Sequence, residues 1–178
     1  MDKKLSEMTL EELWQLFPII LTEHDGRRTE YYAEEAAELA KILPKSTIIN
    51  HIGSTAVKKI RAKPTVDILV EVSGNFAEAA VILLNNGWIK MSESESRMSF
   101  NKGYTESGFA EKVYHLHLRR VGDNDEVYFR DYLNTHREVA KEYETLKLAL
   151  QKKFEHDRDG YTAAKSEFVA KYTALAKR

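Results

Sequence analysis

The chain contains no cysteine, which excludes disulfides, thiolate zinc sites and cysteine nucleophiles. It has no apolar run close to the roughly 20 residues that span a bilayer, and its N-terminus lacks the pattern of a signal peptide. A large excess of one charge is also absent, since the formal net charge is -1. Because duplex binding usually needs a concentrated basic face, we expect no duplex nucleic acid partner. We also expect no membrane partner and a cytoplasmic location.

What is present is a pattern of helices and strands that fits one α+β domain over residues 1–178. Periodicity and capping residues predict N-terminal helices in 1–44, a sheet core with one helix in 45–121, and helices in 122–178. The predicted strands cover about 46–53, 65–72, 88–91, 96–104 and 111–120, and the predicted helices begin near residues 10, 29, 75, 125, 137 and 161.

The end of the first predicted strand holds the first candidate binding residues, Gly53, Ser54 and Thr55. Glycine lets the backbone approach an anion closely, and a hydroxyl that follows it can hold a phosphate oxygen. The spacing of a Walker phosphate loop does not occur. The alternative is that these residues only form the turn after a strand.

A carboxylate, Asp67, interrupts the second predicted strand between Val66 and Ile68. Burying a carboxylate is unfavourable unless it is paired, hydrogen-bonded or bound to a cation. Asp67 is therefore the candidate catalytic residue and a candidate metal ligand, and its oxygens suit Mg²⁺. An ion pair with Lys63 or an arginine is the structural alternative.

Two histidines, His115 and His117, lie two positions apart and so share one face of the last predicted strand. Imidazole binds transition metals such as Zn²⁺, Fe²⁺, Ni²⁺ and Mn²⁺. With Asp67 or His51, the pair would complete a site of two histidines and one carboxylate. Contact with an anion, or filling of the sheet face, are the alternatives.

Two cations beside the predicted strands, Lys63 and Lys102, are candidates for neutralising a phosphate. Together with the Gly-Ser turn, they predict a phosphorylated small molecule or a nucleotide as the partner.

The segment His-Ile-Gly-Ser-Thr-Ala-Val at 51–57, with Ala-Lys-Pro at 62–64 and Asp-Ile-Leu-Val at 67–70, resembles the signature of the GrpB family. Further segments that resemble family blocks lie at 114–118, 129–133, 140–147 and 161–165, so the similarity extends from about residue 51 to residue 170. That family is related to the nucleotidyltransferase superfamily and also occurs fused to some bacterial dephospho-CoA kinases. The resemblance implies a small mixed sheet flanked by helices, of nucleotidyltransferase type, with a C-terminal helical region.

The resemblance also implies roles for particular residues. In active members of the superfamily a Gly-Ser turn grips nucleotide phosphates. An Asp-x-Asp or Asp-x-Glu pair and a third carboxylate from a later strand hold Mg²⁺. Gly53 and Ser54 match the turn, and Asp67 matches the first carboxylate. Arg130 and Lys165 match family blocks on two helices, and the resemblance implies that they close the pocket and bind phosphate from the helical side. For Arg130, a buried pair with Asp131 that docks the helices on the sheet is the alternative.

The chain departs from this pattern at the second carboxylate, where it has Leu69. Glu71 lies on the same strand face, but ~13 Å from Asp67 at about 3.3 Å per residue. The later strand carries histidines in place of an acid, and Lys58 and Lys59 stand where the family commonly has Pro-Gly.

Three functional hypotheses follow. The first is a nucleotidyltransferase-like protein that binds a nucleotide or another phosphorylated small molecule, with nucleotidyl transfer opposed by Leu69. The second is a non-catalytic interaction module of the same fold. The third is a transition-metal protein built on Asp67, His115 and His117.

Overall fold

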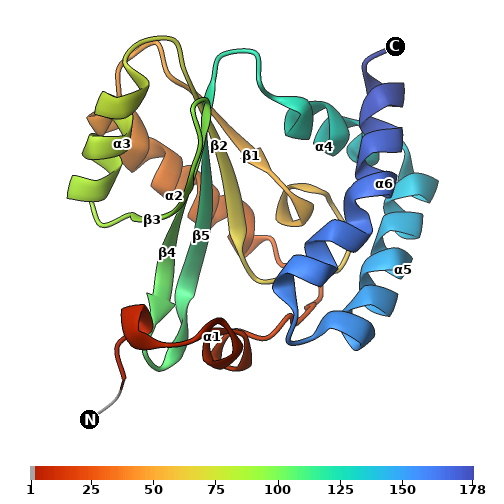
Figure 1. Cartoon of the computed structure of the whole chain (residues 1–178). Helices are drawn as coiled ribbons and strands as arrows, with labels where there is room; N and C mark the ends of the chain where they lie inside the picture. The colour runs from red at the N-terminus through yellow and green to blue at the C-terminus, as the bar shows by residue number, and fades with distance from the viewer. Residues whose placement is uncertain (1–2) are drawn as a thin grey trace.

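A five-stranded mixed sheet forms the centre of the molecule in a computed structural model that describes residues 3–178 (Figure 1). The strand order is β1-β2-β5-β4-β3, in which β2 and β5 run parallel and the other neighbours run antiparallel. The strands are β1 (Ile48–Ile52), β2 (Val66–Val72), β3 (Ile89–Glu93), β4 (Arg97–Thr105) and β5 (Gly108–Arg120).

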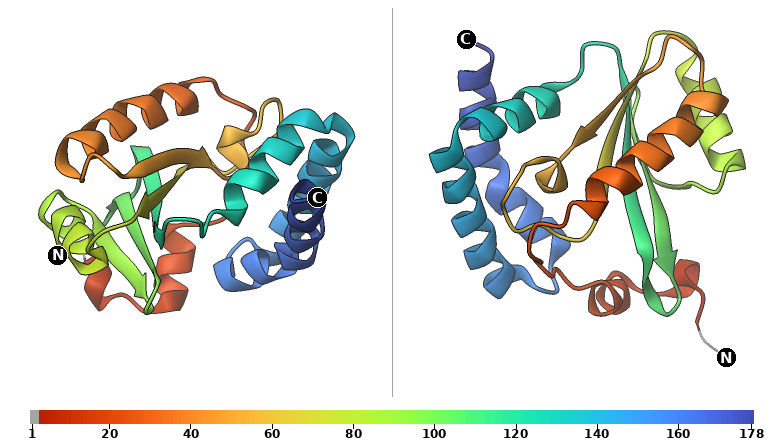
Figure 2. Two further views of the ribbon diagram at one scale, coloured as in Figure 1. Left: turned by 90° about the horizontal axis from the view of Figure 1, so that it is seen from above. Right: turned by 180° about the vertical axis from the view of Figure 1, so that it is seen from behind.

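Helices flank the sheet on both sides (Figure 2). They are α1 (Leu10–Leu16), α2 (Arg27–Ile42), α3 (Phe76–Asn85), α4 (Asp125–Thr135), α5 (Arg137–Phe154) and α6 (Arg158–Ala176), with single 3-10 turns η1 (Leu5–Glu7) and η2 (Ser54–Ala56). This arrangement confirms the predicted α+β class with a C-terminal helical region. None of the helices within residues 3–178 is both long and apolar enough to cross a membrane.

One face of the sheet, here called the apolar face, carries the main core. Side chains alternate between the two faces of a strand, and Ile68, Phe100 and Leu116 all point to this side and have no exposed area. They pack with Leu39 of α2 and Leu83 of α3. Seen from above, α2 and α3 lie to one side of the sheet and α4–α6 to the other (Figure 2).

The opposite face, here called the polar face, carries the chemistry-bearing side chains. Strand pairing places these residues on it: Asp67, Leu69 and Glu71 of β2, His115, His117 and Arg119 of β5, and Ser99 and Asn101 of β4. Helices α4–α6 form a second core beside this face, around Leu133, Ala140 and Tyr143. Val57 and Ile60, from the loop before β2, join that second core and so fix the loop against the helices.

Most element boundaries fall where the local sequence predicts them. Thr9 and Glu12 form the expected capping box at α1, and Gly87 after α3 has a φ of 85°. Helix α6 begins three residues before the predicted start, because the side chain of Asp157 accepts a hydrogen bond from the backbone N–H of Gly160.

Glu71 on the polar face holds the turn between β5 and α4. Its side chain is 1% exposed, and Oε1 accepts hydrogen bonds from Gly122 N at 2.9 Å and Asn124 Nδ2 at 3.2 Å. We expect Glu71→Ala to lower the free energy of unfolding by about 1–3 kcal/mol, because two part-buried donors lose their acceptor. Urea denaturation measures this loss, and the exposed Glu95→Ala is the control. Equal midpoints for the two variants would contradict this role.

Candidate functional site

Asp67 lies where β1, β2 and β5 meet. Strand pairing sets it opposite Ile52 of β1 and His115 of β5. Its Oδ1 atom is 3.3 Å from Nδ1 of His115 and 3.6 Å from Nε2 of His117. The Asp67 side chain is 21% exposed and that of His117 is 29% exposed, so solvent reaches the carboxylate. The structure therefore brings together the acid and both imidazoles that the sequence singled out.

The Gly-Ser turn touches the same carboxylate. Gly53 is exposed and has a φ of 72°, a conformation that side chains other than glycine rarely adopt. A Cβ atom at this position would lie 2.5 Å from Oδ2 of Asp67. Glycine is thus required both by the backbone conformation and by the close approach to Asp67.

His115 links Asp67 to Tyr104 and Arg158. Since Nδ1 faces the carboxylate, it is the nitrogen that carries the proton, and Nε2 accepts from the hydroxyl of Tyr104 at 2.5 Å. Arg158 of α6 approaches both Tyr104 Oη and His115 Nε2 at 3.5 Å.

The electrostatics of the pair assign its protonation state. Burial lowers the pKa of His115 to about 4, and Asp67 offsets this only in part, so the imidazole is neutral near pH 7. Burial would raise the pKa of Asp67, but its interactions with His115 and His117 hold that pKa well below the usual range. The site at neutral pH is therefore an ionised carboxylate beside a neutral imidazole.

Three cations, Lys63, Arg158 and Lys165, surround this carboxylate and are called the cation cluster below. Burial and, to a smaller extent, the charge of Arg158 lower the pKa of Lys63 and of Lys165 to about 8, whereas Asp67 opposes the shift. Within residues 3–178, none of the three cations forms an ion pair with a carboxylate within 4 Å. The cluster is thus a concentration of positive charge that Asp67 neutralises only in part.

Buried aromatic and lysine side chains from the helices form the base of the cluster. The Nζ atom of Lys165 lies 4.3 Å from the ring centroid of Tyr161, which is 1% exposed. Lys147, also 1% exposed, donates to the carbonyl oxygen of Arg61 at 2.5 Å, and burial lowers its pKa to about 7. Because this pKa lies near 7, Lys147 carries only part of a positive charge at neutral pH.

Ser54 points toward the helices. Burial raises the pKa of Tyr143 to about 12, and the same hydroxyl interacts with Ser54 and senses the charge of Asp67. Thr55 is a structural residue here, because its Oγ1 donates to the carbonyl oxygen of Thr65 at 3.0 Å and accepts from Nε2 of His51 at 3.0 Å.

His51 lies on the apolar face, away from His115 and His117. It pairs with Ile68 across the strands and stacks on Tyr32 of α2, with ring centroids 4.7 Å apart. The sequence suggested His51 as a metal ligand. Its side chain is not placed to complete a metal site with Asp67.

Two of the candidate phosphate-binding cations also lie elsewhere. Lys102 is on the apolar-face side of β4, where Nζ contacts Glu35 at 2.7 Å and the hollow beside it also exposes Glu34 and Glu38. Arg130 donates to the carbonyl oxygen of His51 at 2.7 Å and pairs with the adjacent Asp131. Arg130 therefore docks α4 on β1 through the His51 carbonyl, whereas its pair with Asp131 is exposed and not buried as the alternative expected.

The site does not fit the two-metal arrangement of nucleotidyltransferases. Leu69, at the second carboxylate position, has no exposed area, and Glu71 is engaged by the turn before α4. Oδ1 of Asp67 already faces two imidazoles. Across residues 3–178, no group of three or more histidine or acidic side chains is arranged to hold a metal ion.

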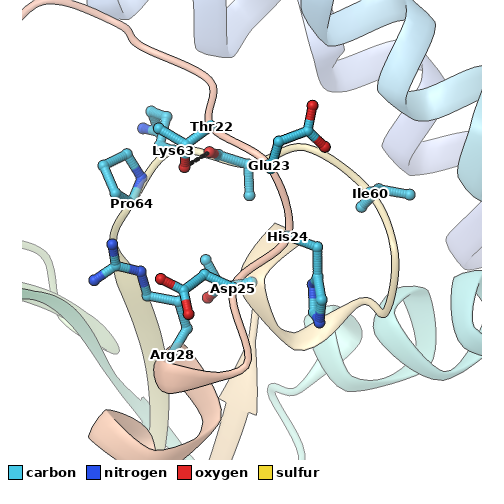
Figure 3. A pocket seen from close by; sticks show the side chains of 10 residues that line it. Thr22, Glu23, His24, Asp25, Arg28, Ile60, Lys63 and Pro64 are labelled. Atoms are coloured by element: carbon cyan, nitrogen blue, oxygen red, sulfur yellow. Dashed lines mark hydrogen bonds between the residues drawn. The ribbon is translucent and has the colours of Figure 1, made fainter.

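Lys63 also lines a small pocket (Figure 3). The strap 22–25 forms one wall and the loop from Ile60 to Pro64 the other, with Thr22 Oγ1 donating to the Ala62 carbonyl oxygen. Its volume of about 10 Å³ suffices for one water molecule. The strap therefore holds the loop that carries Lys63 and does not form a ligand site.

The comparisons with known proteins agree with this structure. A family model described as GrpB protein matches residues 18–175. The chain belongs to the GrpB family. The glutamate-rich protein GrpB of Alkalihalophilus pseudofirmus is 34% identical over 163 residues, which cover 85% of this chain and 91% of that protein. The protein YqkA of Bacillus subtilis is 28% identical over 98% of this chain, but the match spans only 53% of YqkA.

Solved structures place this GrpB-family chain in a wider fold group. The crystal structure of the conserved protein GrpB from Enterococcus faecalis aligns with a TM-score of 0.75 and 28% identity, over 88% of this chain and 96% of that one. The Cid1 poly(U) polymerase bound to Mg 3'-dATP aligns with a TM-score of 0.51 and 10% identity, over 80% of this chain and 44% of the polymerase. The second likeness shows the fold alone, which is nucleotidyltransferase-like.

Proposed function

We propose that this GrpB-family protein binds a phosphorylated small molecule, such as a nucleotide, at Gly53, Asp67 and the cation cluster. The observation that carries the proposal is the convergence of three cations without carboxylate partners on one solvent-reachable site. Concentrated positive charge of this kind attracts small polyanions. The exposed Gly53 allows the backbone amides that follow it to approach a phosphate oxygen.

The proposed roles differ among the candidates. Lys63, Arg158 and Lys165 neutralise the phosphate, and Ser54 contributes a hydroxyl at the edge of the site. Asp67 orients the cluster and interacts with the rest of the ligand. The nucleotides named with the Cid1 structures support a nucleotide as one ligand class, through the fold only.

Binding without ordinary two-metal nucleotidyl transfer is the form of the proposal that the site supports. Transfer of that kind relies on metal ions to stabilise charge on the attacking and leaving oxygens. Leu69 replaces a metal ligand and is fully packed in the sheet. This favours a ligand-binding module over a transferase of the usual mechanism.

Calorimetric titration with nucleoside mono-, di- and triphosphates and sugar phosphates, with and without Mg²⁺, tests the proposal. We expect Lys165→Ala to weaken binding of the best ligand about tenfold or more, since a charge-assisted hydrogen bond contributes roughly 1.5–3 kcal/mol. Lys102→Ala removes the same charge from the opposite face and should change affinity less than about twofold. Failure of every ligand to bind, or an equal loss in both variants, would refute the proposal.

A further inference from the structure

The proposed phosphate site lacks ligands that hold metal ions in proteins of related fold, so another source of positive charge is needed. Metal ions in phosphoryl-transfer sites offset the negative charge of the phosphate and position its oxygens. Here one metal-ligand position is Leu69, and the strand that would supply a third acid has His115 and His117. The donor set for a divalent ion is therefore incomplete.

The fixed charges of the site supply the positive charge that a metal ion would otherwise provide. Lys63, Arg158 and Lys165 carry three positive charges against one negative charge on Asp67, while His115 is neutral. The net charge of two matches the dianion of a phosphate monoester. A guanidinium and two ammonium groups also offer several donors to its oxygens.

The free side of Asp67 adds a second requirement on the ligand. Both imidazoles approach Oδ1, whereas Oδ2 lies toward the exposed Gly53. An ionised carboxylate accepts hydrogen bonds and repels a phosphate oxygen. The ligand must therefore present a donor, such as a hydroxyl, to Oδ2 while its phosphate contacts the cation cluster.

We propose that the site binds a phosphate monoester of a polyhydroxylated molecule without a divalent metal, with the cation cluster on the phosphate and Asp67 on a ligand hydroxyl. This inference rests on the proposed function and narrows its ligand class. It assigns Asp67 to ligand selection instead of metal binding.

The first test compares ribose 5-phosphate with inorganic phosphate by calorimetry, each in excess EDTA and in Mg²⁺. We expect ribose 5-phosphate to bind equally, within about twofold, in both conditions and more tightly than inorganic phosphate. Binding that requires Mg²⁺, or equal affinity for the two ligands, would overturn the inference while leaving the proposed function intact. If neither ligand binds but a nucleoside triphosphate does, the monoester assignment is wrong. If no phosphate compound binds at all, the proposed function fails as well.

The second test uses Asp67→Asn, for which the two possible roles of Asp67 predict opposite results. Without a metal, loss of the negative charge should tighten inorganic phosphate binding about threefold to tenfold, as removal of about 1 kcal/mol of repulsion predicts. The preference for ribose 5-phosphate should fall at the same time. If Asp67 held a metal, the variant would lose phosphate binding instead, and that result would overturn the inference.

A control for folding accompanies this variant. Glu71→Gln makes the same change of carboxylate to amide at a second buried acid of β2, which contacts the turn before α4 and lies outside the proposed site. It should leave the preference for ribose 5-phosphate in place. A preference lost equally in Glu71→Gln and Asp67→Asn would show that the loss comes from the local structure and not from the ligand, against the inference.

Discussion

Acidification from pH 6.5 to pH 4 should lower the free energy of unfolding by several kcal/mol, in large part through two buried histidines. His51 and His115 are both buried, and burial lowers the pKa of each to about 4. In the unfolded chain a histidine titrates near 6.5. The unfolded state therefore binds more protons between these values, and stability is lost as pH falls through this window. The upper limit is about 3 kcal/mol for each histidine at about 1.36 kcal/mol per pKa unit.

Variants can separate this effect from general acid unfolding. His51→Gln and His115→Asn each keep one polar group where the ring nitrogen makes its hydrogen bond, to Thr55 and Asp67 respectively. We expect each variant to reduce the slope of stability against pH between 4 and 6.5, and the double variant to remove most of it. Urea midpoints across this range measure the slope. His24→Gln, at an exposed position, is the control. An unchanged slope in the double variant would contradict the assignment.

Gly53→Ala should both destabilise the protein and strongly weaken phosphate binding. The positive φ of 72° disfavours alanine by about 1 kcal/mol or more, and the added Cβ would sit 2.5 Å from Oδ2 of Asp67. Because the two imidazoles hold Asp67, the carboxylate cannot move aside freely. We expect binding of the best phosphate ligand to fall more than about tenfold, since a displaced site group costs at least this factor.

Gly74→Ala provides the matched comparison for this variant. A Cβ at Gly74 meets no atom within 4 Å, and the turn there lies at the far end of β2 from Asp67. Calorimetry of ligand binding and urea denaturation of both proteins measure the two effects. Normal phosphate binding by Gly53→Ala would show that the close contact between turn and carboxylate is not part of the site.

Much of the fold follows from local sequence. Capping residues, prolines and alternating apolar residues predict nearly every helix and strand, because these signals act within a few residues. The spacing of His115 and His117 correctly places both on one strand face. The parallel pairing of β2 with β5 joins residues about 48 positions apart in the chain, as Asp67 and His115 show. No short-range pattern specifies that pairing.

The errors in the site have specific causes. Side chains two positions apart on a strand point to the same face. Lys102 therefore shares its face with Phe100, which is fully buried in the core, and the sequence already favours the apolar face for this lysine. Arg158 was missed because it lies just before the predicted start of the last helix. The N-capping signal of Asp157 would have moved that start and brought Arg158 onto α6.

The chain order of the site's parts bears on biosynthesis. The turn at Gly53 and the acid at position 67 emerge from the ribosome well before Arg158 and Lys165, which belong to α6 and follow every strand of the sheet. A nascent chain that has completed its sheet still lacks two of the three cluster cations. Bound ligand would therefore stabilise only molecules in which α6 has docked against the sheet. It would protect these molecules selectively from proteolysis.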